Sequence, residues 1–235
     1  MSLEHRVGSI HLRPAAELAE RVLLPGDPHR AFAVAKELLE APRMFNHARG
    51  LWGYTGRAGD GEPLTVQSTG MGGPSAAIVC EELIALGARR LVRIGTCGAL
   101  RDGAEHGDLL AAAVVLPADG TSGALGADGP IRPDPGMLER LVAAGARPAT
   151  VVSTDLFYDP RPDLAAAWVA RGALAVEMEA AAILRVAARR GLRAACVLTV
   201  TDVPGPNGSE RATAEQIEAF GLRVGAAGYA AVRSR

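Results

Sequence analysis

Two arginines beside glycine-containing turns are the residues of this chain best placed by their sequence context to bind an anion. Arg30 follows the turn 25–27, and Arg93 lies in the apolar run 91–94, which ends in the turn 95–98. An unpaired charge inside an apolar strand is costly, so the context of Arg93 favours a bound counter-anion. For any single arginine the alternative is a solvated side chain on a helix or loop.

A third glycine-rich turn, 70–73, follows another short apolar run. Glycine permits close backbone approach to a ligand, and N–H groups at the start of a following helix can face an anion. Each turn alone is more often structural than ligand-binding. Three such turns with arginines nearby favour an anion site.

Acidic residues suited to holding a sugar occur in the sequence Glu177-Met178-Glu179. An ionised carboxylate only accepts hydrogen bonds, and therefore suits a vicinal diol. It can also stabilise positive charge that develops on a reacting ring. The alternative for both glutamates is a favourable interaction with the N-terminus of a helix.

Asp202 and Phe157 have both functional and structural interpretations. A positioned carboxyl can transfer a proton to a reacting group, but Asp202 also precedes the turn-forming residues 203–205. The ring of Phe157 could provide a platform for a heterocycle, or it could belong to the core. The local sequence leaves these alternatives open.

The elements that must position these residues alternate between strands and helices. This alternation predicts an α/β fold with a central parallel or mixed sheet covered by helices on both faces. Ligands bind at the carboxyl ends of strands in such sheets. No linker divides the chain, so we expect one domain over 1–235. The expected strands are 22–24, 64–67, 91–94, 109–116, 151–153 and 194–200, the expected helices are 28–40, 74–86, 178–190 and 211–233, and 117–133 is expected to be a loop.

Composition restricts the classes of partner. The 235 residues carry a formal net charge of −1, which gives no reason to propose nucleic acid or a membrane surface as a partner. No apolar run is long enough to span a membrane, and no apolar signal segment follows the first residues. The three cysteines lie in apolar stretches without a C-x-x-C pair, as expected for reduced thiols in the cytoplasm.

Seven motifs occur in the order found in one family. They are Leu-Pro-Gly-Asp-Pro-His-Arg at 24–30, Arg-Gly-Leu-Trp-Gly-Tyr-Thr-Gly at 49–56, Thr-Gly-Met-Gly-Gly-Pro-Ser at 69–75, Arg-Ile-Gly-Thr-Cys-Gly at 93–98, Ser-Thr-Asp-Leu-Phe-Tyr at 153–158, Val-Glu-Met-Glu-Ala-Ala at 176–181 and Val-Thr-Asp at 200–202. From about residue 9 to about residue 203, the chain resembles the trimeric and hexameric nucleoside phosphorylases, which include bacterial purine nucleoside phosphorylase and uridine phosphorylase. The resemblance implies a single-domain fold with a mixed, partly barrel-like sheet flanked by helices.

The resemblance also implies a role for each matching residue. Asp202 matches the acid that protonates or hydrogen-bonds the departing purine at N7. Arg49 and His11 match residues that reach the site of a neighbouring subunit. The implied phosphate-binding residues are Gly26, Arg30, Arg49, Arg93 and Thr96, the ribose-binding residues are His11, Met178 and Glu179, and the base-binding residues are Phe157 and Glu177.

The implied activity is phosphorolysis of a nucleoside to free base and ribose 1-phosphate, without a metal or organic cofactor and with inorganic phosphate as co-substrate. Asp202 favours purines. The segment 119–122 is more typical of the uridine enzymes, although no glutamine follows Phe157 and Tyr158 to read a pyrimidine. Arg211 is a candidate partner of Asp202 whose role stays open. The implied assembly is a homo-oligomer built from dimers, in the form of a hexamer.

Two other functions compete with phosphorolysis. A nucleosidase of the same fold would use water, but such enzymes lack the phosphate arginines that match Arg30, Arg49 and Arg93. A nucleoside-binding protein without catalysis would not need to keep Asp202 or both glutamates of the 177–179 motif.

Overall fold

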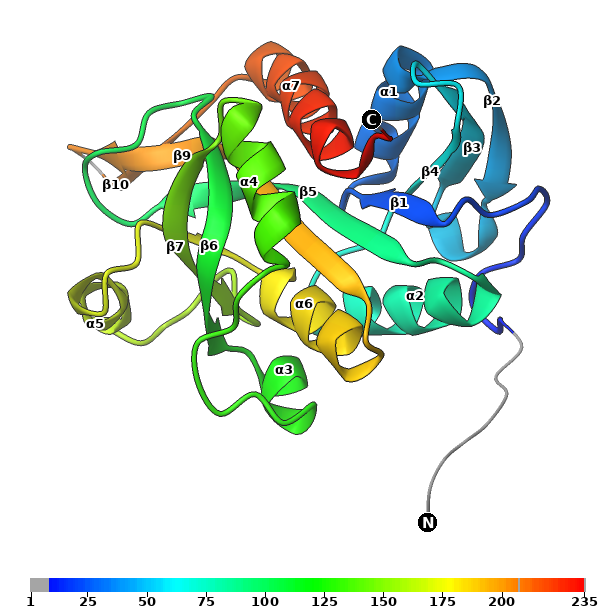
Figure 1. Cartoon of the computed structure of the whole chain (residues 1–235). Helices are drawn as coiled ribbons and strands as arrows, with labels where there is room; N and C mark the ends of the chain where they lie inside the picture. Colours follow the sequence, from blue (N-terminus) through cyan, green and yellow to red (C-terminus); the bar gives the residue numbers. More distant parts are fainter. Residues whose placement is uncertain (1–8, 207, 235) are drawn as a thin grey trace.

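The strands of the described part of the chain join in one mixed sheet (Figure 1). The structure is a computed structural model that describes residues 9–206 and 208–234. The strands lie in the order β10-β9-β6-β7-β8-β5-β1-β4-β3-β2. Their bounds are β1 (Arg21–Leu24), β2 (Leu39–Asn46), β3 (Gly53–Ala58), β4 (Pro63–Gln67), β5 (Arg90–Ala99), β6 (Leu109–Ala118), β7 (Arg147–Thr154), β8 (Ala175–Glu177), β9 (Arg193–Gly205) and β10 (Gly208–Arg211).

An additional pairing of β9 with β5 closes part of this sheet. The strands β9, β6, β7, β8 and β5 form a closed mixed barrel, and β1, β4, β3 and β2 extend the sheet outward from β5. Parallel pairing joins β4 to β1, β1 to β5 and β5 to β9, so the carboxyl ends of these four strands lie at the same edge. The predicted α/β class with a mixed, partly barrel-like sheet is confirmed.

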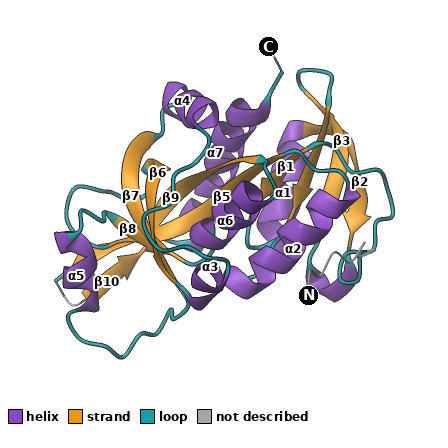
Figure 2. Cartoon of the chain, turned by 60° about the horizontal axis from the view of Figure 1, so that its bottom comes forward, coloured by secondary structure: helices purple, strands orange, loops and turns teal. Residues whose placement is uncertain are grey.

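Helices cover the sheet on both sides, as predicted. Helices α1 and α4 both contact α7 on one side, whereas α2, α3 and α6 pack together on the other (Figures 1 and 2). Among the described residues, none of the helices is long and apolar enough to cross a membrane. Their bounds are α1 (Pro28–Leu38), α2 (Gly73–Leu86), α3 (Gly120–Ala124), α4 (Pro135–Ala143), α5 (Leu164–Ala170), α6 (Ala180–Arg189) and α7 (Ala214–Val232).

Local sequence explains where the helices near the strand ends begin. The Asp27 side chain accepts the N–H of His29 at 3.0 Å, and proline at the first position of α1 has no N–H to leave unpaired. Thr213 and Gln216 form a reciprocal capping box at the start of α7. The residues of β1 are buried throughout because helices cover both faces of the parallel sheet.

The structure differs from the sequence prediction where short elements interrupt expected loops and helices. The predicted loop 117–133 contains α3, because the Asp119 carboxylate accepts the N–H of Ser122 at 2.6 Å and caps the helix. The last helix begins at residue 214 rather than 211, since Gly208–Arg211 forms strand β10 instead. Strands β2 and β3 and helices α4 and α5 were not predicted.

Candidate active site

The turns that follow β1 and β4 meet at the carboxyl edge of the sheet. The carbonyl of Pro25 accepts the N–H of Thr69 at 2.8 Å, and the carbonyl of Gly26 accepts the N–H of Gly70 at 3.0 Å. A Cβ atom on Gly26 would lie only 3.2 Å from the Gly70 carbonyl oxygen, so glycine permits this close approach. Two of the three glycine-rich turns therefore form one surface, as expected for neighbouring parallel strands.

Glu179 is the residue that links this surface to β5. It lies between β8 and α6 and is almost completely buried. Its Oε1 atom accepts the N–H of Gly72 at 2.6 Å, and its Oε2 atom pairs with Nη2 of Arg93. Burial raises the pKa of the Glu179 carboxyl, and the positive charge of Arg93 opposes that rise. The carboxylate expected to bind ribose thus lies directly against an arginine expected to bind phosphate.

Arg93 is held between two carboxylates. Its Nε atom donates to Oε2 of Glu177 at 2.7 Å, while Nη2 contacts Glu179. The guanidinium lies over Gly95, where a Cβ atom would come within 2.8 Å of Cζ. Burial would lower the pKa of Arg93, but Glu179 and Glu177 raise it above its usual value. The counter-charge predicted for this buried arginine is therefore supplied by the protein.

Nη1 is the nitrogen of Arg93 for which neither Glu177 nor Glu179 provides a hydrogen bond. Among the described residues, Nη1 of Arg93 is buried without a hydrogen-bond partner. A buried donor normally has a partner, so the unpaired nitrogen beside Glu179 is consistent with a bound ligand. An anion oxygen at this position would satisfy Nη1.

Glu177, which was predicted to contact the base, is buried and paired with groups of the protein itself. Its side chain has no exposed surface, and its Oε1 atom accepts the hydroxyl of Ser153 while Oε2 accepts Nε of Arg93. The same carboxylate accepts the N–H groups of Glu179 at 2.8 Å and Ala180 at 2.9 Å. Glu177 therefore stabilises the start of α6 and orients Arg93, which corresponds to the helix-terminus interpretation of this residue.

Arg30 lies in the same electrostatic neighbourhood. Burial lowers the pKa of the Arg30 guanidinium, Asp27 and Glu179 act in the opposite direction, and Arg93 adds to the lowering. Its aliphatic stem packs toward Gly221 of α7, where a Cβ atom would lie 3.4 Å from Cγ. Two arginines and one buried glutamate are therefore gathered at the carboxyl ends of β1 and β5.

Arg30, Arg93 and Glu179 together form what we call the arginine–glutamate cluster. Two further predicted residues lie on neighbouring positions of the chain. Thr96 is half-buried on β5, close to the end of the strand and opposite Thr199 of β9. Met178 is half-buried between the two glutamates of its motif. Thr96 lies on the same strand as Arg93, and Met178 directly precedes Glu179.

Asp202 occupies the β9–β10 hairpin, where it faces Arg211 directly across the two strands. Nη1 of Arg211 donates to Oδ1 of Asp202 at 3.0 Å, and the hydroxyl of Thr201 donates to Oδ2 at 2.7 Å. Asp202 also lies opposite Gly98 of β5, so the side chain stands at the same strand ends as the cluster. The structure thus gives Arg211 a position that the sequence left open: it is the ion-pair partner of Asp202.

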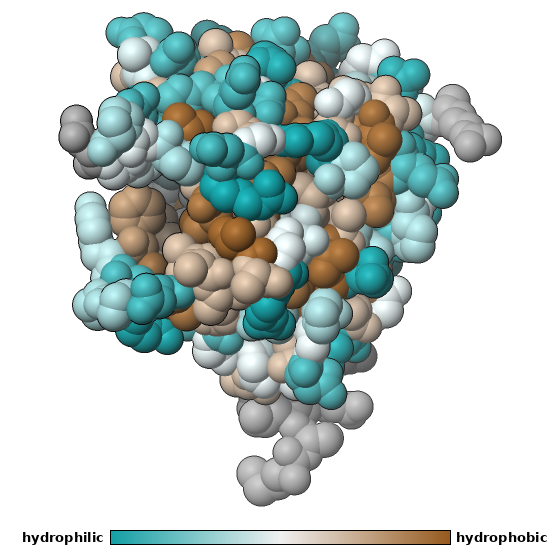
Figure 3. Space-filling model, turned by 90° about the vertical axis from the view of Figure 1, so that its left-hand side faces the viewer, coloured by the Kyte–Doolittle hydropathy of each residue, from teal (hydrophilic) through white to brown (hydrophobic). Residues whose placement is uncertain are grey.

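Phe157 lies on the surface rather than in the core. It follows β7, which pairs with β8 through Ser153 and Glu177, and its side chain is 65% exposed. The ring meets Tyr158 edge-on with centroids 5.0 Å apart, and Leu156 is also exposed. Figure 3 looks onto the side of the molecule that carries α5 and β10, where apolar surface is bordered by hydrophilic residues. Exposed apolar surface of this kind is typical of a ligand-binding region.

His11 and Arg49 are not part of the arginine–glutamate cluster. Within the described residues, neither side chain forms a hydrogen bond or ion pair with Arg93 or Glu179. Arg49 is exposed on a tight turn and has a left-handed backbone with a φ of 60°. Backbone strain at a residue other than glycine is often retained at functional positions.

A buried asparagine joins the two segments that carry His11 and Arg49. Oδ1 of Asn46 accepts the N–H of Arg13 at 2.8 Å, and Nδ2 of Asn46 donates to the carbonyl of Leu51 at 2.5 Å. The segment after His11 and the turn around Arg49 therefore share one surface of the protein. The sequence analysis did not single out Asn46, and its burial at the end of β2 could not be read from local sequence.

The segment 119–122, which resembles the uridine enzymes, has a structural role. Asp119 caps α3, and Asp155 accepts the N–H of Gly120 at 2.7 Å. These contacts join α3 to the end of β7. These contacts account for the polar residues of the segment without a bound base. The segment 119–122 therefore does not distinguish a purine substrate from a uracil substrate.

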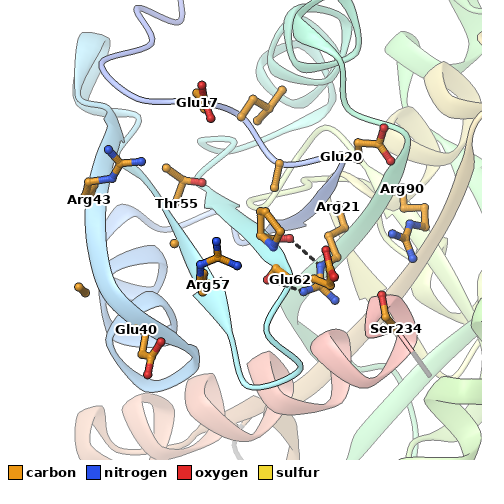
Figure 4. A pocket seen from close by; sticks show the side chains of 15 residues that line it. Glu17, Glu20, Arg21, Glu40, Arg43, Thr55, Arg57, Glu62, Arg90 and Ser234 are labelled. Carbon is orange, nitrogen blue, oxygen red and sulfur yellow. Dashed lines mark hydrogen bonds between the residues drawn. The ribbon is translucent and has the colours of Figure 1, made fainter.

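A separate cavity of about 590 Å³ opens at the opposite, amino-terminal ends of β1 and β5 (Figure 4). Arg21 begins β1 there and is almost completely buried, with Nη2 donating to Oδ1 of Asp60 at 2.6 Å and Nε donating to the carbonyl of Pro63 at 2.7 Å. Other arginines and glutamates line the cavity in mixed order. Unlike Nη1 of Arg93, all three nitrogens of Arg21 have hydrogen-bond partners in the protein, so this end of the sheet differs from the arginine–glutamate cluster.

The closed barrel carries, at its strand ends, two arginines packed with the buried carboxylate of Glu179. The chain belongs to the phosphorylase superfamily, whose family model matches residues 20–234. The resemblance noted in the sequence is thereby confirmed.

Curated relatives and solved structures agree with this membership. The chain is 38% identical to a DeoD-type purine nucleoside phosphorylase from Jannaschia sp. (strain CCS1), over 83% of this chain and 87% of the relative. It is also 38% identical to a DeoD-type purine nucleoside phosphorylase from Geobacillus kaustophilus (strain HTA426), over 83% of this chain and 86% of the relative. A crystal structure of uridine phosphorylase from Vibrio fischeri ES114, complexed with 6-hydroxy-1-naphthoic acid, superposes with a TM-score of 0.80 and 26% identity, covering 91% of this chain and 90% of that one.

Proposed function

We propose that the chain catalyses the phosphorolysis of purine nucleosides to free base and ribose 1-phosphate. The contact between Arg93 and Glu179 carries this proposal, because it puts a cation for phosphate beside a carboxylate for the sugar. Arg30 and the N–H of Gly26 complete the anion site at the same strand ends, with Thr96 on β5 as an additional hydroxyl donor. The proposed reaction uses inorganic phosphate as co-substrate and requires neither a metal nor an organic cofactor.

The reaction follows from these positions. A phosphate oxygen held by Arg30 and by Nη1 of Arg93 attacks the anomeric carbon of the ribose. The glycosidic bond breaks, and its electron pair leaves with the base. Glu179 accepts hydrogen bonds from the vicinal diol and stabilises the positive charge that develops on the sugar ring, while the backbone at Met178 assists in binding the ribose. Asp202 transfers a proton to N7 of the purine, and Arg211 balances the charge of the carboxylate that remains.

Purines are favoured over uracil by two observations. The relatives that match the chain at 38% identity are named purine nucleoside phosphorylases. The Asp202 carboxyl stands opposite Gly98 at the strand ends, where a base stacked near Phe157 would present N7. The similarity in fold to a uridine phosphorylase keeps uridine as the alternative substrate.

Base release measured with and without phosphate tests the proposed reaction. We expect inosine, adenosine or guanosine to release base only when phosphate is present, with formation of ribose 1-phosphate, and uridine to react more slowly. Sulfate at the same ionic strength is the control, because it has a similar shape but does not form the product. Equal rates without phosphate would indicate a nucleosidase, and nucleoside binding without turnover would indicate a binding protein.

We further propose that the active unit is a dimer whose two sites are each completed by the other copy, and that such dimers assemble into a hexamer. Arg49 and His11 lie on segments joined by Asn46, outside the arginine–glutamate cluster. Ile10 and Met44 expose apolar side chains on these same segments. A surface that combines exposed apolar residues with an exposed arginine and a histidine fits the site of a second copy that binds phosphate and ribose.

Mixed oligomers test whether sites are shared. The variants Arg49→Ala and Asp202→Asn should each have low activity alone and should regain activity when they are refolded or expressed together. A mixed dimer contains one site with Asp202 from one copy and Arg49 from the other, which explains the expected recovery. A double variant carrying both substitutions, mixed with Arg49→Ala, is the control and should not recover. Failure of the first mixture to recover would mean that each site uses residues of one chain.

A further inference from the structure

Glu82 is a buried acidic residue that the proposed reaction does not use. It lies in α2, and its side chain is only 6% exposed. The carboxylate faces the segment 9–12, which crosses α2 before β1 begins. The donors that converge on it are Ser9 Oγ at 2.9 Å, Ile10 N at 3.2 Å, His11 N at 3.0 Å, Leu12 N at 2.7 Å and His11 Nδ1 at 2.6 Å.

These contacts keep Glu82 ionised. Burial would raise the pKa of the carboxyl, but hydrogen bonds from the N–H of Leu12, from His11 and from the Ser9 hydroxyl lower it to about 2. At neutral pH the group therefore only accepts hydrogen bonds. Among the described residues, the donors that face it come from the short segment 9–12 that contains His11.

An ionised partner determines which nitrogen of His11 carries the proton. Since the Glu82 carboxylate can only accept, Nδ1 of the His11 ring must be the donor across the 2.6 Å contact. In the neutral ring, Nε2 then has a free lone pair and acts as an acceptor. The side chain of His11 is 33% exposed, so this acceptor can face a ligand beyond the surface of its own chain.

We propose that Glu82 is a positioning residue for the sugar: it fixes the place and the tautomer of His11, so that Nε2 accepts a hydrogen bond from a ribose hydroxyl in the site of a second copy. This inference rests on the proposed function and its shared sites. Because Glu179 suits the vicinal 2′,3′-diol, the hydroxyl left for His11 is the 5′-hydroxyl. Together, Glu82 and His11 would therefore favour nucleosides that carry a hydroxyl group at the 5′ position.

Substitution of Glu82 by glutamine separates positioning from packing. The amide keeps the shape of the carboxylate, but its NH2 group can donate to Nδ1 and thereby move the ring proton to Nε2. Nε2 would then be a donor rather than an acceptor. Glu81→Gln is the matched control, because Glu81 is the adjacent residue on α2 and pairs with Arg190 on the surface. Ser9→Ala is a second control, since it removes a contact to Glu82 and leaves the His11 ring untouched.

The first readout is the preference for a purine nucleoside over its 5′-deoxy analogue, measured as the ratio of the two kcat/KM values. In the unmodified protein the ratio should be about tenfold, the size expected for one hydrogen bond. Glu82→Gln and His11→Ala should each reduce this kcat/KM ratio to near one. The double variant should show the same ratio as either single variant. Glu81→Gln and Ser9→Ala should keep the ratio of the unmodified protein. If Glu82→Gln slows both substrates equally and the ratio persists, Glu82 is structural and the inference is overturned.

The second readout does not depend on activity. In protein labelled with 15N at histidine, the chemical shifts of Nδ1 and Nε2 report the tautomer, and the His11→Ala variant assigns the His11 signals. We expect the Nδ1–H tautomer in the unmodified protein and the Nε2–H tautomer in Glu82→Gln. An Nε2–H tautomer in the unmodified protein would overturn the inference. If no nucleoside is turned over at all, the proposed phosphorolysis fails, whereas the tautomer still decides the role of Glu82.

Discussion

Asp202→Asn lowers kcat for purine nucleosides by about 10²–10⁴-fold, the range typical of a lost proton donor, while KM changes little. Asparagine keeps the size of the side chain and a carbonyl oxygen that can accept Nη1 of Arg211, so the hairpin is maintained. It cannot supply a proton to N7, so the base must leave as a poor anionic leaving group. Steady-state kinetics with inosine at saturating phosphate measure this effect.

A substrate that needs no proton provides a sharp control for this prediction. In an N7-methylated purine nucleoside the base already carries positive charge, so Asp202→Asn should retain most of its activity on that substrate. Glu210→Gln makes the same chemical change on β10, beside Arg211, and should leave kcat for both substrates unchanged. If Asp202→Asn slows the methylated nucleoside as strongly as inosine, the residue positions the base and is not the acid.

The meeting of the glycine-rich turns could be predicted from the sequence because it depends on local pattern and strand direction. Apolar runs ending in glycine predicted strands, and parallel strands bring their carboxyl ends to one edge, where Gly26 and Gly70 are in contact. The partners of Arg93 could not be predicted in this way. Glu177 is 84 residues distant in sequence, and only the antiparallel pairing of β8 with the end of β5 brings it beneath the guanidinium.

Several local features were present in the sequence but were outweighed by a broader pattern. The sequence 205–208, Gly-Pro-Asn-Gly, is typical of a tight turn, and it could have indicated the β9–β10 hairpin that gives Arg211 its place opposite Asp202. Asp119 followed three residues later by Ser122 could have indicated the start of α3. The richness of 117–133 in glycine and proline favoured a loop, whereas a helix was expected from residue 211 onward. The exposure of Phe157, by contrast, depends on tertiary packing that no local signal records.

Arg93→Met is expected to lower the free energy of unfolding by about 3–5 kcal/mol, the range observed when one partner of a buried ion pair is removed. Methionine fills much of the space over Gly95 but leaves Glu177 and Glu179 buried beside each other without a cation. Urea denaturation in phosphate-free buffer measures the loss. Arg90→Met, at the other end of β5, is the matched control and should have a much smaller effect, because Arg90 is only partly buried.

The pH dependence distinguishes loss of the cation from a packing defect. Burial raises the pKa of Glu179 already, and removing Arg93 raises it further above the value in the unfolded chain. A group whose pKa is raised by folding favours the folded state at low pH and destabilises it as pH rises. The defect of Arg93→Met should therefore be small near pH 4.5 and grow toward pH 8. A defect of equal size at both pH values would contradict the electrostatic explanation.

A compensated variant separates the fold from the proposed chemistry of the same residues. Adding Glu177→Gln and Glu179→Gln to Arg93→Met replaces the two uncompensated buried carboxylates by neutral amides. Most of the lost free energy of unfolding should therefore return. Phosphate-dependent base release should not return, because the cation for phosphate and the carboxylate for ribose are both absent. If this stable triple variant still cleaves nucleosides with phosphate, Arg93 and Glu179 are structural, and the catalytic centre lies elsewhere in the protein.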